Sequence, residues 1–312
     1  MSGKGKNAID MTGGSLWKNI LVFSLPLMMT QMLEVLFNLS DVAIAGKYAD
    51  YIALGAVGST ALLVSLFTGI LIGMGAGVNV RTAHQLGAEK TSGSSETVAR
   101  TVYSGLIVCL IIGIILCLVC NIFARPMLET LKTKDELIES AVLYLKIYAL
   151  GMPAMAVYNF GNGVLSACGE TKKPLVYLSI AGVLNVILNI FFVVVCKKAA
   201  DGVAIASVIA QYLSASMIMC HLLRRKDSCK LRLSNKYFDT SACGGVLMIG
   251  IPTGMQNAIF AVANLFVQTG VNHFDAVMVS GNSAAQNADT LIFNVMAAIY
   301  TACASFISRN HG

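Results

Sequence analysis

Charged residues are scarce in this chain. Asp, Glu, Lys and Arg make up 12% of its 312 residues and apolar residues make up 56%, whereas ordinary soluble domains carry about a quarter charged residues. So little charge cannot cover a water-exposed surface of this size, and the mean hydropathy is +0.72. We therefore expect lipid to cover most of the protein.

Basic residues are nearly missing from the long apolar runs. Lys146 is the only Lys or Arg well inside one. It lies about two turns from the end of that run, close enough for its ammonium group to reach the interface. A cavity for an anionic diphosphate would need Arg or Lys, so this scarcity argues against a flippase for lipid-linked sugars.

Metal-ligand and enzyme motifs are also missing. The four histidines are scattered, and Cys117 and Cys120 form a C-x-x-C inside an apolar run with no second pair nearby. We interpret the cysteines, Cys168 among them, as small packing residues. There is no H-E-x-x-H and no Ser/His or Cys/His arrangement on the apolar runs, so we expect no cofactor, no metal site made from His and Cys, and no integral-membrane enzyme.

Eight apolar runs are long enough to cross a membrane as helices. Each has about 20 residues or more, which spans a hydrocarbon core of roughly 30 Å. The runs cover approximately 16–45, 53–76, 98–123, 139–166, 174–196, 202–223, 244–272 and 278–306. The sequence therefore predicts an all-α integral membrane protein. The first run has no small-residue cleavage site behind it and is interpreted as a retained helix.

The loops between the runs predict the orientation. With the N-terminus in the cytoplasm, 15 Lys and Arg residues fall on the cytoplasmic side and 6 on the other. This bias predicts a multi-pass protein of the cell membrane with a cytoplasmic N-terminus. The basic stretch 224–236 is interpreted as a solvated loop beside anionic lipid, in preference to a regulatory or nucleic-acid site. No nucleic-acid partner is expected.

Landmarks near the start of the chain recur near its end. Three residues have a residue of the same type 226 positions later, in the pairs Pro26 and Pro252, Asn38 and Asn264, and Gly55 and Gly281. Both copies are apolar helical stretches, so the repeat indicates a membrane transporter made of two helical bundles with a binding site where they meet.

The longest charged stretch between runs marks the predicted boundary of the two bundles. We expect a complete six-helix N-lobe at 1–223, a cytoplasmic linker at 224–243 and two helices of a C-lobe at 244–312. The second copy stops after two helices, so we expect a fragment of a protein roughly 130 residues longer, as a complete repeat requires. The fragment alone should not transport. A monomer is expected.

Polar side chains on the first run form one face. Gln31, Glu34, Asn38 and Asp41 fall within an arc of roughly 80° on a helix, and two of them are carboxylates. An ionisable group inside a membrane is costly and persists mainly where it faces a cavity. Asp41, near the outer end of the run, can alternatively reach the interface. Glu34 lies near the middle of the membrane.

Other runs carry polar residues that extend this predicted cavity. They are Asn185 and Asn189 in the fifth run, Tyr158 and Asn162 in the fourth, Asn257 and Asn264 in the seventh, and Gln286 and Asp289 in the eighth. For a single amide, a hydrogen bond between helices is at least as good an explanation as a substrate contact. Together, carboxylates and amides suit cations. Pro26 and Pro252 are predicted hinges, because proline removes one helical hydrogen bond.

Several short motifs are shared with a known family. They are Ser24-Leu25-Pro26, then Phe37, Asn38, Asp41 and Gly46, Ala53-Leu54-Gly55, Gly169-Glu170-Thr171-Lys172-Lys173-Pro174, Asn185, Asn189, Gly202-Val203-Ala204 and Ala210-Gln211. In their order and spacing they resemble the bacterial side of the multidrug and toxic compound extrusion (MATE) family. The resemblance runs from about residue 15 to the end of the chain.

This resemblance implies a twelve-helix antiporter that exports organic cations in exchange for H⁺ or Na⁺. Asp41 then matches the family's cation-coupling acid, with possible Na⁺ binding there, and Asn185 matches an amide of the same site. Asn189 departs from the family, which often has an aspartate at that position. We expect Glu34 to supply the second carboxylate, an inference of our own and not a family assignment.

Overall fold

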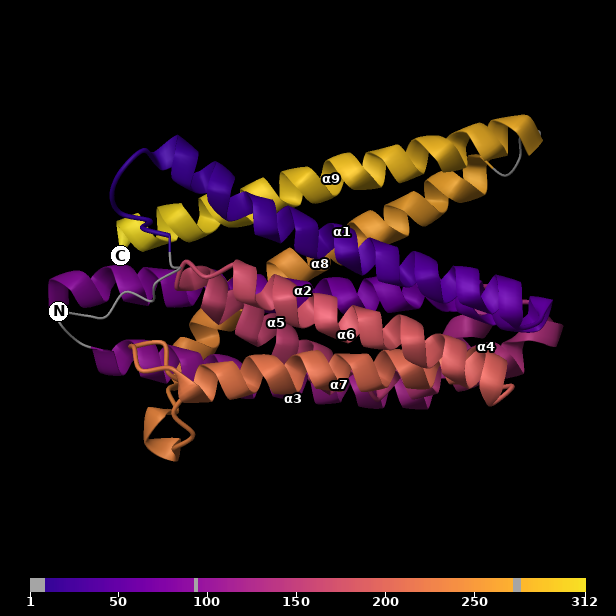
Figure 1. The fold of residues 1–312 in the computed structure, drawn as a ribbon, viewed down its shortest axis with the longest axis horizontal. Coiled ribbons are helices and arrows are strands. Elements are labelled where there is room, and N and C mark those ends of the chain that lie inside the picture. The colour runs from indigo at the N-terminus through magenta and orange to yellow at the C-terminus, as the bar shows by residue number, and fades with distance from the viewer. Residues whose placement is uncertain (1–8, 93–94, 272–275) are drawn as a thin grey trace.

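The protein is helical throughout the part that its computed structural model describes, which is residues 9–92, 95–271 and 276–312. Figure 1 shows long helices that run side by side. They are α1 (Leu16–Tyr48), α2 (Tyr51–Ser92), α3 (Ser95–Thr130), α4 (Asp135–Ala149), α5 (Met152–Ala167), α6 (Lys172–Ile190), α7 (Ala200–Arg224), α8 (Thr240–Val271) and α9 (Ala276–His311), with a π-helical turn η1 (Phe191–Val195) and a 3-10 turn η2 (Asn235–Tyr237).

Seven of the described helical segments are long and apolar enough to cross a membrane, and there are eight if the bent pair α4 and α5 is one span. This confirms the predicted all-α membrane fold. The predicted fourth run is bent by 44° between its two halves. The break between α4 and α5 is Leu150–Gly151, and Pro153 is the second residue of α5. A proline there has no N–H to continue the preceding helix.

The outside of the bundle is apolar. Large side chains such as Trp17, Ile122, Phe266 and Ile307 are more than two-thirds exposed, at 76%, 68%, 73% and 69%. Such a surface is too apolar for water but suits lipid tails, because an exposed apolar patch of this extent marks a membrane or protein contact. The interior is packed around α2, which contacts α3, α4, α5, α8 and α9.

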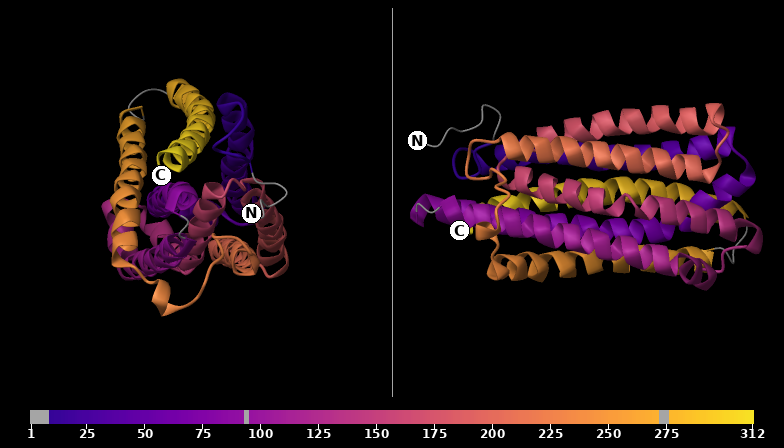
Figure 2. Two further views of the ribbon diagram at one scale, coloured as in Figure 1. Left: turned by 90° about the vertical axis from the view of Figure 1, so that its left-hand side faces the viewer. Right: turned by 90° about the horizontal axis from the view of Figure 1, so that it is seen from below.

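Helices α2 and α8 approach each other closely through glycines. A Cβ atom placed on Gly73 would lie 2.5 Å from the Cα of Gly254, and one on Gly77 would lie 2.9 Å from the backbone N of Gly250. Small residues allow helix backbones in a membrane to touch. In the end-on view of Figure 2, α8 and α9 stand beside the helices of the α1–α7 bundle.

Residues 225–239 connect α7 to α8 and lie against the α1–α7 bundle. The Tyr103 hydroxyl of α3 donates to Oδ1 of Asn235 at 3.0 Å, and the backbone N–H of Asp239 donates to Ser104 Oγ at 2.9 Å. We call this segment the linker. In Figure 1 it lies at the same end of the molecule as the C-terminal end of α9. The division into two lobes at residue 223 stays a prediction.

One cysteine interpretation is wrong. Cys168, at the end of α5, forms a disulfide with Cys229 of the linker. The two are 61 residues apart in the sequence, and they meet because the linker folds back over the end of α5. Spacing alone gives no sign of this contact.

Pro26 and Pro252 both lie inside continuous helices, α1 and α8, so their hinge role stays a prediction.

Candidate functional site

Asp41 lies inside the bundle, where three helices meet. It is 7% exposed, although it lies in the C-terminal part of α1, two turns before the end of the helix. Asn189 of α6 donates from Nδ2 to Oδ1 of Asp41 at 2.5 Å, and Ser207 of α7 donates from Oγ to Oδ2 at 3.0 Å. The alternative that Asp41 simply reaches the membrane surface does not fit this burial.

Two asparagines and a serine complete the cluster around this carboxylate. Asn189 also donates to Oδ1 of Asn185 at 3.2 Å, and Asn185 donates to Ser207 Oγ at 3.2 Å. The asparagines are four residues apart on α6, so they lie on one face of that helix. Asn185 therefore bonds to both partners of Asp41, and all three residues are buried, with exposures of 4% for Asn185, 0% for Asn189 and 6% for Ser207. We call these four residues the Asp41 cluster.

The cluster carries one formal negative charge, and one of its oxygen atoms accepts no hydrogen bond from the described residues. In the described part of the chain, no Lys, Arg or His forms an ion pair with Asp41. The buried Oδ1 of Asn189 has no hydrogen-bond partner there either. A buried carboxylate without a positive partner is costly. This donor set of carboxylate, amide and hydroxyl oxygens is the kind that a hard cation prefers.

The backbone changes form directly beside the cluster. Helix α6 ends at Ile190, one residue after Asn189, and continues as the π-helical turn η1. Such turns are rare and are frequent at functional sites, because they widen the helix and turn side chains to new directions. The irregular turn therefore lies where the carboxylate receives its amide partner.

Sequence reasoning missed Ser207. It is a single serine within the apolar helix α7, and such a hydroxyl commonly bonds to its own helix. Ser214 does this, donating to the carbonyl O of Gln211 at 2.9 Å. Nothing in the sequence separates the two serines. Only the packing of α7 against α1 and α6 shows that Ser207 contacts the carboxylate.

The other candidates on the first run do not join the cluster. Glu34 and Gln31 are half-buried and Asn38 is exposed. No hydrogen bond or ion pair within the described residues joins Glu34 to Asp41. The buried Oε1 of Gln31 has no partner among those residues. Glu34 as a second carboxylate for coupling stays a prediction.

The candidates on α5 divide into one structural contact and one open acceptor. The Tyr158 hydroxyl is buried and donates to the carbonyl O of Pro174 at 3.2 Å, which ties α5 to α6. Asn162 is half-buried, and its Oδ1 is another buried oxygen with no partner in the described part of the chain. The substrate roles of both stay predictions.

The candidates on α8 and α9 whose side chains the structure describes are not brought to the Asp41 cluster. Asn257 donates to the carbonyl O of Gly69 on α2 at 3.2 Å, which is the helix-to-helix alternative for an amide. Asn264 and Asp289 are exposed, and the Gln286 side chain lies outside the described residues. Within the searched residues, no group of three or more His, Cys, Asp and Glu side chains is placed to hold a metal ion.

Comparison with known proteins identifies the family. The family model MatE matches residues 26–191, which is more than half of the chain and includes Asp41, Asn185 and Asn189. The "Probable multidrug resistance protein YpnP" of Bacillus subtilis is 27% identical over 307 residues, covering 98% of this chain and 67% of that protein. The "Probable multidrug resistance protein NorM" of Thermotoga maritima is 23% identical over 306 residues, covering 95% and 63%.

A solved structure has the same fold. It is described as the outward-facing conformation of a multidrug resistance MATE family transporter, with a TM-score of 0.86, 20% identity, and coverage of 99% of this chain and 68% of that one. The chain spans 57% to 67% of the length of the first three curated relatives, so the activity of the whole protein is a proposal. With a matching family model over more than half its length and an all-helical membrane fold, the chain belongs to the MatE family of membrane transporters and is not an enzyme.

Proposed function

We propose that the protein is a secondary active antiporter that exports small organic cations in exchange for H⁺ or Na⁺ by alternating access. It needs no cofactor. We place it in the cell membrane as a monomer with the N-terminus and the linker on the cytoplasmic side, which the Lys and Arg bias supports. The likeness to proteins named for multidrug resistance supports the transport of foreign small molecules.

One observation supports this proposal most strongly: Asp41 is buried among neutral partners only. Its charge is compensated neither by a basic side chain of the described residues nor by water at the surface. Binding a cation or a proton relieves that cost. The cluster can therefore exchange one positive ligand for another, which is what coupling between an ion and a drug requires.

The cluster suits Na⁺ and H⁺ in different ways. Na⁺ would take oxygen ligands, which Asp41, Ser207, Asn185 and Asn189 can supply after small rotations of the amides. A proton on Asp41 would turn one carboxylate oxygen into a donor. Either amide oxygen can accept that hydrogen bond, and the free Oδ1 of Asn189 is already unpaired.

The substrate cavity that we propose lies on the inner face of α1, near the Asp41 cluster. Glu34 contributes a second carboxylate, and Gln31 and Asn162 contribute buried oxygens that lack hydrogen-bond partners in the described part of the chain. Acceptors of this kind match the N–H groups of a protonated amine. A lipid-linked diphosphate would instead require basic residues beside these oxygens. The only basic residues in the sequence of α1 are Lys18 and Lys47, at its two ends.

Efflux of a cationic dye tests the proposed function. Membrane vesicles that contain the complete protein are loaded with dye, and a proton gradient and a sodium gradient are imposed separately. We expect one gradient to drive efflux and the Asp41→Asn protein to show none. Efflux that proceeds equally with no gradient, or that requires ATP, would contradict secondary antiport.

A further inference from the structure

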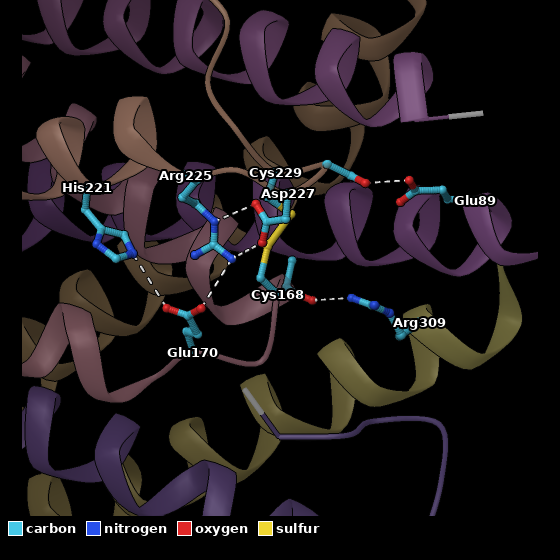
Figure 3. The surroundings of a disulfide bond; sticks show 10 residues. Glu89, Cys168, Glu170, His221, Arg225, Asp227, Cys229 and Arg309 are labelled. Carbon is cyan, nitrogen blue, oxygen red and sulfur yellow. Dashed lines mark hydrogen bonds and ion pairs between the residues drawn. A yellow bond between two sulfur atoms is a disulfide. The ribbon is translucent and has the colours of Figure 1, made fainter. Parts of the chain in front are cut away.

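The turn between α5 and α6 joins the linker to the α1–α7 bundle. Cys168 begins this turn and forms a disulfide with Cys229 of the linker (Figure 3). One residue earlier, the carbonyl O of Ala167 accepts a hydrogen bond from Nη1 of Arg309 on α9 at 2.9 Å. The disulfide therefore lies where the linker, the end of α5 and the end of α9 meet.

Charged side chains surround this disulfide. Figure 3 shows Arg225 between Glu170 and Asp227. Arg225 is paired with Glu170 at 3.3 Å and with Asp227 at a shorter distance, and its side chain is 7% exposed. His221 lies 3.6 Å from the other oxygen of Glu170. The pair of Arg225 with Glu170 is thus a second, non-covalent contact between the linker and the turn, beside the disulfide.

Arg225 stays protonated between these two carboxylates. Burial by itself lowers the pKa of Arg225, but the hydrogen bond to Asp227 and the charges of Asp227 and Glu170 outweigh that effect and raise the pKa above its ordinary value. Removing one member of a buried ion pair is strongly destabilising. The network is therefore a stable frame that keeps the two cysteines close in both redox states.

The location of the disulfide suggests that it is reversible. It lies on the side of the membrane that the basic residues predict to be cytoplasmic, and thiols there are kept reduced, so cytosolic disulfides are usually transient. Cys229 is 2% exposed, whereas Cys168 is half-buried. Cys168 is therefore the more exposed cysteine of the pair and the one that we expect a small reagent to attack first.

We propose that Cys168 and Cys229 are a thiol–disulfide modification site that controls the mobility of the linker and of the α5–α6 turn. The oxidant is a low-molecular-weight disulfide. The Cys168 thiolate attacks it and releases one small thiol, and the Cys229 thiolate then attacks the mixed disulfide at the Cys168 sulfur and releases the second. Two electrons pass to the reagent, and the two protons leave with the released thiols.

Oxidation adds a covalent tie to a segment that is otherwise held by weaker contacts. In the dithiol form, the ion pairs of Arg225 and the bonds of Asn235 and Asp239 to α3 hold the linker. In the disulfide form, only residues 230–239 remain to follow a movement of α8. The disulfide also restricts the turn beside Ala167, whose carbonyl O accepts the hydrogen bond from Arg309. The end of α9 should therefore separate from this turn less often.

Cysteine labelling at controlled redox potential tests the site itself. The purified protein is equilibrated with reduced and oxidised glutathione in varying ratio, quenched with acid, unfolded and alkylated. The chain has 9 cysteines, of which 7 are free in the structure. Within residues 1–312 we expect nine labels under reducing conditions and seven under oxidising ones, with Cys168 and Cys229 losing label together. Loss from another pair, no loss at any ratio, or resistance to excess dithiothreitol would overturn the proposal.

Hydrogen exchange tests the effect on mobility. We expect amides of residues 225–239 to exchange about tenfold more slowly in the oxidised protein, because local opening then has to work against a cross-link. Cys168→Ser should remove this redox dependence, and Cys220→Ser, which changes an exposed free cysteine of α7, should keep it. Equal exchange in both redox states of the unmutated protein would overturn the role of the site.

These readouts separate the redox proposal from the proposed antiport. Neither labelling nor hydrogen exchange needs a transported substrate, so either proposal can fail while the other holds. If both hold, the oxidised protein should export dye more slowly than the Cys168→Ser protein in the same oxidant. Equal rates would overturn control of transport by the disulfide.

Discussion

Asn79 of α2 donates from its Nδ2 to Oγ of Ser305 on α9 at 2.8 Å, and the two residues are 226 positions apart. That separation equals the period of the sequence repeat, which relates Pro26 to Pro252. The repeat shifts by one residue further along, where Gly87 corresponds to Gly312 at a separation of 225, so Asn79 and Ser305 lie at or within one residue of equivalent positions. Such positions meet only close to a symmetry axis, as the predicted pseudo-two-fold relation between the copies would require.

The contact between Asn79 and Ser305 should hold α2 and α9 together at this point. Both residues are buried, at 2% and 0% exposure. Ser305→Ala leaves the Asn79 amide unpaired and should cost about 1–3 kcal/mol, whereas Asn79→Ala should cost about 1 kcal/mol, because the Ser305 hydroxyl can still donate to the Thr301 carbonyl O. Separation of the two helices is measured by hydrogen exchange of the backbone amides of residues 69–87 and 298–311.

A local substitution on α9 is the control for that comparison. The Thr301 hydroxyl donates to the carbonyl O of Ala297 in its own helix, so Thr301→Ala should leave the exchange of α2 unchanged. Equal exchange in the Ser305→Ala protein and in the unmutated protein would show that the bond between Asn79 and Ser305 does not hold α2 and α9 together.

Ser207 should contribute to ion binding although the sequence gives no sign of it. Ser207→Ala removes one hydrogen bond to the Asp41 carboxylate and one acceptor for Asn185. A hydrogen bond to a charged group is worth about 1.5–3 kcal/mol, so we expect the ion concentration for half-maximal efflux to change by at least about tenfold. Ser214→Ala is matched in burial and helix, and should change nothing.

Ser207 also shows where prediction from sequence stops. The apolar runs predict the helices, because each helix must satisfy its own backbone in lipid and its length is fixed by the membrane. The polar face of α1 predicts Asp41, because a carboxylate inside a membrane is expensive. A serine costs little there and gives no such signal. Its role depends on which helix packs beside α1, and hydropathy does not encode that.

Neither the disulfide nor the bend in the fourth span could be predicted from the sequence, for related reasons. Cys168 and Cys229 meet because the linker folds back, which depends on buried pairs such as Arg225 with Glu170. Periodicity along the chain carries no information on such long-range contacts. Gly151 and Pro153 did stand inside an apolar run, and a break there is consistent with the local chemistry of proline. The apolar pattern continues through the bend and hides it.

Gly73 should be intolerant of any side chain. Its Cβ would meet the backbone of Gly254 on α8, which cannot rotate away as a side chain can. Gly73→Ala should push α2 and α8 apart and cost about 1–3 kcal/mol, the usual range for an overpacked interior. Thermal unfolding of the purified protein measures this as a lower melting temperature.

Gly58 is the matched control on the same helix. A Cβ atom there has no neighbour within 4 Å. Gly58→Ala should be neutral or stabilise the protein by about 0.5–1 kcal/mol, because alanine favours a helix interior over glycine. A melting temperature that falls equally in both variants would mean that the loss does not come from the contact between α2 and α8.

Asp41→Asn should abolish coupling while preserving the fold. Asparagine has nearly the same size and can still accept the hydrogen bond from Ser207, but it has no charge to attract a cation. If Na⁺ is the coupling ion, adding it should raise the melting temperature of the unmutated protein relative to choline, because a ligand that binds only the native state stabilises it. Asp41→Asn should lose that rise. If H⁺ is the coupling ion, the variant should lose efflux driven by a proton gradient.

Glu34→Gln is the comparison that tells the two carboxylates apart. Glu34 has no bond to the Asp41 cluster in the described residues, so Glu34→Gln should reduce dye affinity and weaken the ion response less than Asp41→Asn does. Asp41→Asn should remove the ion response at every dye concentration. If Asp41→Asn instead exports dye at the unmutated rate under the same gradient, the coupling acid lies elsewhere, and Asp289 on α9 becomes the next residue to substitute.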